Sequence, residues 1–168
     1  MRAVLLFLSL FLILQDRSQA DEPLPAMPGP TVLTVTGHIG VANAQNAAML
    51  DLTFLQNLPA VTIKTSTPWT TGLSVFVGVR LRDLLTRLDA KTVKYVEAKA
   101  IDDYTAQIPL ADIRAYDVII AYRLDGKALD QMSRGPLWII YPYTDHDDLQ
   151  QEIYYNRGVW QLDRLIVN

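Results

Sequence analysis

The two histidines and one acidic stretch are the residues that could bind a metal ion. His38 and His146 lie far apart in the sequence, whereas zinc sites usually place histidines a helical turn apart or combine them with cysteines. Three carboxylates fall within Thr144–Asp148, but this stretch lacks the central glycine and closing glutamate of a calcium-binding EF-hand loop. Acidic residues also favour the start of a helix. We therefore expect no metal ligands here and predict a helix that begins near Asp147.

Nucleophilic side chains give no catalytic signature. The serines after residue 20 are Ser66, Ser74 and Ser133, and none lies in a G-x-S-x-G motif. There is no glycine-rich phosphate-binding loop. The sequence also has no cysteine, which excludes disulfides, thiolate zinc sites, cysteine-bound iron–sulfur clusters and a cysteine nucleophile. We predict no catalytic residue from these patterns.

Aromatic residues gather near the end of the chain, with an arginine among them. The group consists of Tyr141, Tyr143, Tyr154, Tyr155, Arg157 and Trp160. Aromatic rings with an arginine can line a binding cleft. Aromatic residues at alternating strand positions more often belong to a buried core. The sequence leaves both interpretations open.

Helical periodicity is clearest at residues 79–88. Four leucines there recur at spacings of one, three and four residues, namely Leu81, Leu84, Leu85 and Leu88. The arginines lie off that stripe. This spacing predicts an amphipathic helix. Asp51 can cap a shorter helix that ends before Pro59, and Pro109 can begin a helical turn.

Strands are indicated by apolar and β-branched runs bounded by turn residues. They are predicted at 32–37, 61–65, 93–100, 104–108, 118–124, 137–141 and 159–167. A hairpin turn is marked by Asp102 and Asp103. Because the strands are scattered among single short helices without regular alternation or repeats, we predict an α+β domain with a mixed β-sheet.

The start of the chain has the features of a cleavable signal peptide. Arg2 precedes an apolar run over Ala3–Leu14, and small residues end at Ala20. A retained membrane anchor is the alternative, but this run is short for a bilayer core of about 30 Å. We predict cleavage after Ala20, a periplasmic or secreted protein, and no stable membrane span after cleavage.

The remaining chain is predicted to be one domain. Residues 21–30 hold four prolines and form an extended lead-in, and residues 31–168 form the domain itself. Removal of residues 1–20 leaves 13 basic and 17 acidic residues, so the net charge changes from −3 to −4. Nucleic-acid binding is not expected, because it depends on clustered lysine and arginine.

Several segments taken in order resemble a known family. They are Thr62–Thr65, the leucine helix from Gly78 to Leu85, Tyr104 with Ile108–Leu110, Ala121–Leu129, Gly135–Pro142, Val159–Trp160 and Ile166–Val167. Together they resemble the sulfite-oxidase-type molybdopterin-binding domain over residues 60–167. The resemblance implies a mixed-sheet fold with a pyranopterin in a cleft. It also implies a molybdenum ion held by a cysteine thiolate just after the strand at 61–65.

This sequence departs from that pattern at the metal ligand. Thr65 or Ser66 stands where the thiolate is expected, and a neutral hydroxyl does not replace a soft anionic ligand. We favour a cofactor-free, non-catalytic domain that binds a small ligand or a periplasmic protein partner. The alternative is a molybdopterin-dependent oxidoreductase with a non-cysteine metal environment.

The hypothetical cleft for the favoured function combines residues from separate parts of the resemblance. Its members are Thr65, Ser66, Trp69, Tyr104, Arg157 and Trp160. In this hypothesis Arg157 donates hydrogen bonds to an anionic ligand, and the aromatic residues form apolar walls.

Overall fold

The computed structural model describes residues 24–168. The predicted signal peptide at 1–20 and the start of the lead-in lie outside the described residues. Residues 24–30 form neither helix nor strand. Leu24 and Met27 pack against the main core, and the Gly29 amide donates a hydrogen bond to Asp51 Oδ2 at 2.9 Å. The lead-in is therefore attached to the domain where the first helix begins.

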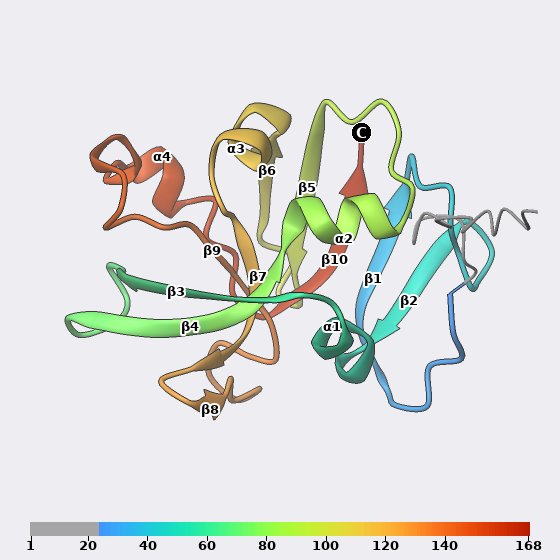
Figure 1. Cartoon of the computed structure of the whole chain (residues 1–168), viewed down its shortest axis with the longest axis horizontal. Helices are drawn as coiled ribbons and strands as arrows, with labels where there is room; N and C mark the ends of the chain where they lie inside the picture. Colours follow the sequence, from blue (N-terminus) through green and yellow to red (C-terminus); the bar gives the residue numbers. More distant parts are fainter. Residues whose placement is uncertain (1–23) are drawn as a thin grey trace, which may run out of the picture.

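The first sheet has the strand order β2-β1-β10-β5-β6 (Figure 1). Its strands are β1 (Thr31–Gly37), β2 (Ala47–Asp51), β5 (Tyr95–Ala100), β6 (Thr105–Pro109) and β10 (Leu162–Val167). β10 pairs parallel with β1 and antiparallel with β5. The last strand of the chain therefore lies in the middle of this sheet.

The second sheet has the order β3-β4-β7-β8, and a further strand, β9, also pairs with β7. Its strands are β3 (Ala60–Ser66), β4 (Leu73–Arg80), β7 (Ile119–Leu124), β8 (Lys127–Ala128) and β9 (Trp138–Ile140). β4 approaches β7 closely at Gly78, where a Cβ atom would lie 2.2 Å from the Ile120 carbonyl oxygen. A glycine is therefore required for these strands to pair at this distance.

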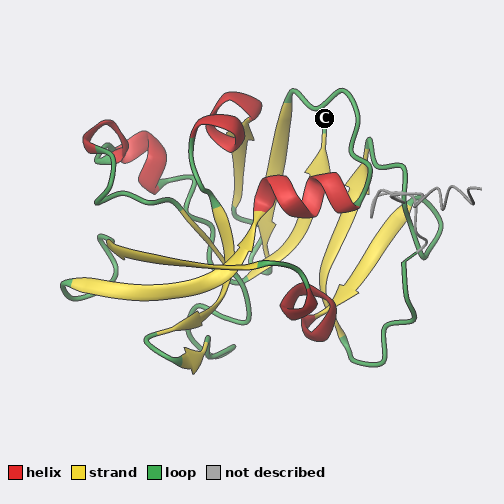
Figure 2. Ribbon diagram, in the orientation of Figure 1, coloured by secondary structure: helices red, strands yellow, loops and turns green. Residues whose placement is uncertain are grey.

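Short helices connect and cover the strands. They are α1 (Leu52–Asn57), α2 (Leu81–Arg87), α3 (Leu110–Ala115) and α4 (Glu152–Tyr155), with a 3₁₀ turn at Asp147–Leu149. Asp51 caps α1 by accepting the Phe54 amide at 2.7 Å, as predicted. Figure 2 shows α2 lying across the first sheet, and its leucine stripe is buried in the main core, also as predicted.

The apolar side chains form two clusters. The larger one combines residues of the first sheet and of the helices with residues of β4, β7 and β9, such as Val79, Ile120 and Ile139. The smaller one belongs to the second sheet and consists of Ile63, Phe76, Ile119, Ala121, Leu129, Trp138 and Ile140. Trp69 and Trp160 pack against the smaller cluster while staying partly exposed. This edge of the smaller cluster is where the candidate site lies.

Several elements differ from the sequence expectations. β2 and β4 were not predicted, and Val79 and Arg80 end β4 instead of beginning the helix. An apolar residue at the junction fits either period, so spacing alone does not locate the boundary. The helix expected near Asp147 is a single 3₁₀ turn without a side-chain cap.

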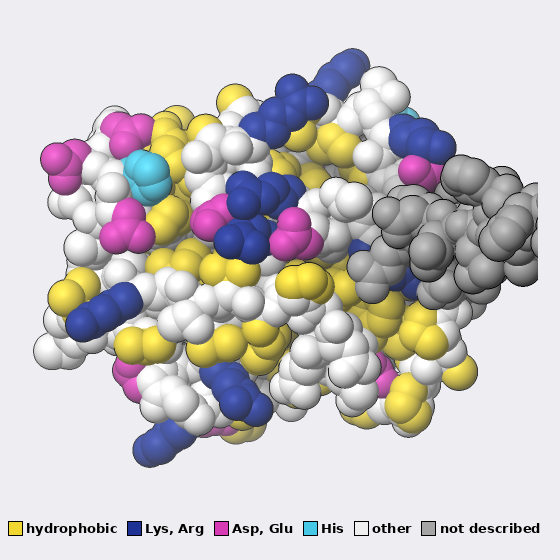
Figure 3. Space-filling view, in the orientation of Figure 1, with side chains coloured by type: hydrophobic (Ala, Val, Ile, Leu, Met, Phe, Trp, Pro, Cys, Tyr) yellow, Lys and Arg dark blue, Asp and Glu magenta, His cyan; other side chains and the backbone are white. Residues whose placement is uncertain are grey.

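The surface mixes the two signs of charge. On the face that carries α2, basic and acidic side chains lie next to one another (Figure 3). For example, Arg82 and Asp117 form an ion pair at 2.5 Å. Within residues 24–168, no helix combines the length and apolar character needed to cross a bilayer.

Candidate binding pocket

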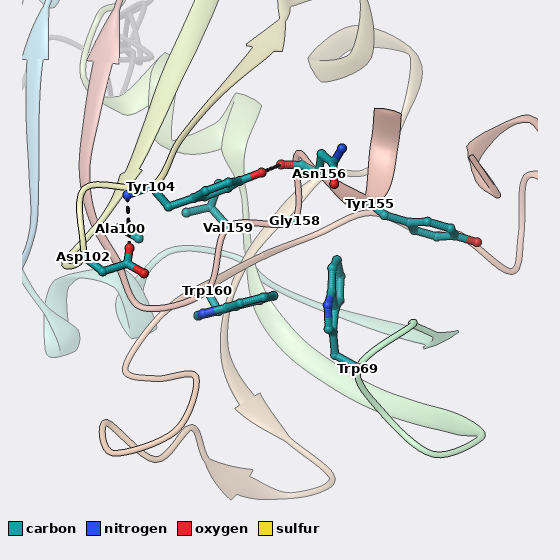
Figure 4. A pocket seen from close by; sticks show the side chains of 9 residues that line it. All are labelled: Trp69, Ala100, Asp102, Tyr104, Tyr155, Asn156, Gly158, Val159 and Trp160. Carbon is teal, nitrogen blue, oxygen red and sulfur yellow. Dashed lines mark hydrogen bonds between the residues drawn. The ribbon is translucent and has the colours of Figure 1, made fainter. Parts of the chain in front are cut away.

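A cavity of about 240 Å³ lies where three segments meet. These segments are the β3–β4 loop at 67–72, the β5–β6 turn at 101–104 and the stretch that follows α4. The lining residues are Trp69, Ala100, Asp102, Tyr104, Tyr155, Asn156, Gly158, Val159 and Trp160 (Figure 4). We call this cavity the aromatic pocket, because four of its lining side chains are aromatic rings.

The β3–β4 loop supplies Trp69. The Thr67 hydroxyl accepts the Trp69 amide at 3.1 Å and lies 2.9 Å from the Thr70 hydroxyl, which fixes the turn. The indole packs edge to face against Trp160, with ring centroids 5.2 Å apart. A Cβ atom at Gly158 would lie 3.3 Å from Trp69 and 2.9 Å from the Tyr143 hydroxyl. Glycine at 158 therefore lets the chain pass close to both rings.

The stretch after α4 supplies Trp160. The Ile139 amide donates to the Val159 carbonyl at 2.9 Å, and Trp138 and Trp160 form an isolated β-bridge. The two indoles also meet edge to face at 6.3 Å. Trp160 is thus held in place by β9 and by the smaller cluster.

The β5–β6 turn supplies Tyr104 and Asp102. The Tyr104 side chain is 47% exposed, and its hydroxyl donates to the Asn156 carbonyl at 2.7 Å. Asp102 Oδ1 accepts the Tyr104 amide at 3.1 Å. Figure 4 shows the Tyr104 and Trp160 rings on opposite sides of the pocket, with Trp69 at one end and Asp102 at the other.

Charge in the pocket comes from one side chain. Among the described residues, Asp102 is the only one that lines the cavity with a carboxylate, and no lysine or arginine lines it. Asp103 points to a different partner, because Lys99 Nζ lies 2.7 Å from its carboxylate and lowers the pKa of Asp103. Asp102 has no such ion pair within residues 24–168.

Arg157 lies outside this lining. Its Nη1 donates to Asp112 Oδ2 at 2.7 Å, and the Tyr141 hydroxyl donates to the same oxygen at 2.9 Å. The guanidinium also stacks over the Tyr154 ring at 5.2 Å. We call Asp112, Tyr141 and Arg157 the Asp112 network. Burial, reinforced by the negative charge of Asp112, raises the pKa of Tyr141.

Thr65 and Ser66 also lie outside the pocket, at the end of β3. Thr65 is fully buried, and its Oγ1 accepts the Thr144 amide at 3.0 Å and contacts the Thr144 hydroxyl at 3.2 Å. The Ser66 amide donates to Thr144 Oγ1 at 3.0 Å. The hydroxyl of Thr65 is therefore engaged within the protein. The family resemblance implies a soft, anionic thiolate as the molybdenum ligand at this point, and a neutral hydroxyl does not replace it, so these residues do not fit that group.

The acidic stretch is occupied by internal contacts. The Tyr116 hydroxyl donates to Asp148, and His146 packs edge to face against Tyr116 at 5.0 Å. In the part of the chain that the structure describes, no three histidine, aspartate or glutamate side chains gather in a way that could hold a metal ion.

Three of the six sequence-predicted site residues meet in the pocket, namely Trp69, Tyr104 and Trp160. The other three lie elsewhere: Thr65, Ser66 and Arg157. Sequence reasoning missed Asp102 and Asn156 as lining residues. Asp102 was noted only as a turn residue. Its position two residues before Tyr104 was the one feature of the sequence that could have indicated its place in the pocket.

Comparison with known proteins identifies the family. The sequence model of the oxidoreductase molybdopterin binding domain matches residues 33–144. The chain belongs to the oxidoreductase molybdopterin-binding domain family. No match was found among curated proteins.

A solved relative shows the same fold as this molybdopterin-binding domain. The sulfane dehydrogenase SoxCD from Paracoccus pantotrophus matches with a TM-score of 0.61 and 18% identity, over 89% of this chain and 39% of that chain. The present chain thus spans less than half of that protein's length. Within the pocket, Trp69 and Tyr104 fall inside the family match, whereas Trp160 lies beyond its end at residue 144.

Proposed function

We propose that this molybdopterin-binding domain protein is exported and non-catalytic, and that it binds a small organic ligand in the aromatic pocket. The observation that carries the proposal is the pocket itself, a cavity of about 240 Å³ with rings on several sides and few polar groups. Small-molecule sites have this character, since apolar walls supply affinity and a few polar atoms fix orientation. A periplasmic protein partner is the other occupant that the sequence suggested, but the small size of the cavity favours a small molecule.

The architecture supports a preformed site. The Tyr104–Asn156 hydrogen bond joins two walls of the pocket, and the Trp69–Trp160 contact joins the other two. Walls that are held in place without a ligand lose little side-chain entropy on binding, which favours affinity.

The non-catalytic part of the proposal rests on Thr65. The family resemblance implies a cysteine thiolate on molybdenum, and this sequence has no cysteine. The buried Thr65 hydroxyl is already hydrogen-bonded to Thr144. Family membership itself favours the alternative, a molybdopterin-dependent oxidoreductase with a non-cysteine metal environment. The two candidates differ in whether the native protein contains molybdenum.

Ligand-observed NMR with a library of small organic compounds tests the binding proposal. Compounds that bind the wild-type protein should no longer show binding to the Tyr104→Ser variant, because this substitution removes one wall of the pocket. Met132→Ser is the control, because Met132 is 91% exposed and lies outside the lining. The proposal fails if the library gives no binders, or if Tyr104→Ser and Met132→Ser retain them equally.

Export is tested separately by the intact mass of the secreted protein. A mature chain that begins at or near Asp21 supports the proposal, because signal peptidase cleaves after small residues such as Ala20. A mature chain that still carries Met1–Leu14 contradicts it.

A further inference from the structure

We propose that the ligand of the aromatic pocket is a small organic cation, such as a quaternary or protonated amine. This inference rests on the proposed binding function and names the ligand class for the same site. It is carried by aromatic walls together with the Asp102 carboxylate, which has no ion pair within residues 24–168, and by a lining that contains no basic residue among the described residues.

The walls provide faces that attract positive charge. The π-system of an aromatic ring is negative on its face, so a cation within about 6 Å of the centroid is stabilised, most strongly by tryptophan. Tyr104 and Trp160 lie on opposite sides of the pocket, and Trp69 closes one end (Figure 4). A cation between them would meet more than one ring at once.

The carboxylate of Asp102 adds a full negative charge at the end opposite Trp69. Its neighbour Asp103 is neutralised by Lys99 at 2.7 Å, but Asp102 has no ion pair in the described chain. Asp102 accepts the Tyr104 amide but is not neutralised by a basic side chain, so a cation in the pocket would gain an attraction to this charge.

The arrangement of basic residues disfavours an anion. Arg157, next to the lining residues Asn156 and Gly158 in sequence, directs its guanidinium to Asp112 at 2.7 Å. An anionic ligand would meet Asp102 without a compensating positive charge, and like charges repel. A neutral ligand would gain apolar burial alone. The expected order of affinity is cation, then neutral compound, then anion.

A matched series of probes tests this order. Choline, 3,3-dimethyl-1-butanol and 3,3-dimethylbutanoate share a similar bulky head and differ in charge. Their dissociation constants can be measured by NMR titration at neutral pH. Choline should bind at least about fivefold more tightly than the alcohol, because cation–π attraction of about 1 kcal/mol corresponds to such a ratio. The anion should bind most weakly.

Two substitutions in the same turn provide the matched control. Asp102→Asn should weaken choline binding about three- to tenfold and leave the alcohol unchanged, since only the charge is removed. Asp103→Asn should change neither affinity, because that carboxylate is paired with Lys99. Tyr104→Phe, which keeps the ring, should retain more choline binding than Tyr104→Leu. Melting temperatures confirm that each variant is folded.

The outcomes separate the two proposals. Equal affinities for choline and the alcohol, or no effect of Asp102→Asn on choline, overturn the cation inference while the pocket still binds a ligand. If no probe binds but library compounds do, the cation inference fails alone. If neither binds, both proposals fail.

The source of the cation is resolved by a second assay. Cosedimentation with phosphatidylcholine vesicles would identify a lipid headgroup as the ligand. Binding of free choline without cosedimentation would identify a free solute.

Discussion

The aromatic pocket and the Asp112 network lie next to each other along the chain but use polar side chains in opposite ways. In the network, Asp112 is 7% exposed and accepts hydrogen bonds from both Arg157 and Tyr141. In the pocket, rings surround an open cavity and the carboxylate of Asp102 has no ion pair within residues 24–168. The first arrangement satisfies its charges internally, whereas the second leaves one available to a ligand.

The shared stretch after α4 makes the contrast instructive. Asn156 and Gly158 line the pocket, while Arg157 between them contacts Asp112. In the proposed function, neighbouring residues thus serve binding and stability separately. The division predicts that substitutions in the Asp112 network lower the free energy of unfolding and leave the pocket lining unchanged. Substitutions in the pocket should weaken ligand binding with a much smaller loss of stability.

The largest expected effect is on the network. Asp112→Ala should lower the free energy of unfolding by about 3 to 5 kcal/mol, because it leaves the charge of Arg157 and the hydroxyl of Tyr141 without their acceptor. Urea titration measures this. Arg157→Ala should also destabilise the ligand-free protein. Asp102→Asn should change stability by less than about 0.5 kcal/mol. Equal stability of the Asp112→Ala and Asp102→Asn variants would remove the distinction between the regions.

The main core gives a reference for the size of that loss. Leu84→Ala should cost about 2 to 5 kcal/mol through lost burial and a cavity, because Leu84 is fully buried in α2. Arg82→Ala on the same helix should cost much less, since its ion pair with Asp117 is at the surface. Comparable losses in denaturant titrations would mean that both faces of α2 contribute equally.

Alkaline pH should lower the free energy of unfolding through the buried tyrosines of the Asp112 network and its surroundings. Burial raises the pKa of Tyr141 and of Tyr143, whereas an unfolded tyrosine ionises near pH 10. The unfolded chain therefore loses these protons first, so stability is full below about pH 10 and falls as pH rises further. Each such tyrosine contributes about 1.4 kcal/mol per pH unit. Tyr141→Phe should make the decline shallower in urea titrations at several pH values, and an unchanged slope would contradict the assignment.

At the pocket wall we expect a smaller loss of stability than in the network or the main core. Tyr104→Phe removes the hydrogen bond to the Asn156 carbonyl and should cost about 0.5 to 1.5 kcal/mol. The melting temperature should therefore fall only slightly. A loss as large as that of Asp112→Ala would show that Tyr104 belongs to the structural framework.

Much of the fold was predictable because its signals are local. The leucine stripe of α2 and the Asp51 cap of α1 depend on residues within a few positions of one another. β4 was missed because its pattern merges with that of the following helix at Val79. Its position depends on close pairing with β7 at Gly78, which the sequence alone does not reveal.

The site was predictable only in part because its deciding contacts are distant in sequence. Trp69, Tyr104 and Trp160, which line the pocket, were predicted from residue type and from the family resemblance. Arg157 was assigned to the ligand because its partner Asp112 lies 45 residues earlier, and no local pattern indicates that pair. Asp102 was missed because a turn aspartate has the same local appearance whether or not it faces a cavity.

The most direct test of the account is the molybdenum and pterin content of the protein purified from its native host, with a cysteine-containing member of the family as the positive control. The account predicts that the control carries molybdenum and this protein carries none, because Thr65 offers a buried hydroxyl that is already bonded to Thr144. Stoichiometric molybdenum in this protein would contradict the account and establish the oxidoreductase alternative.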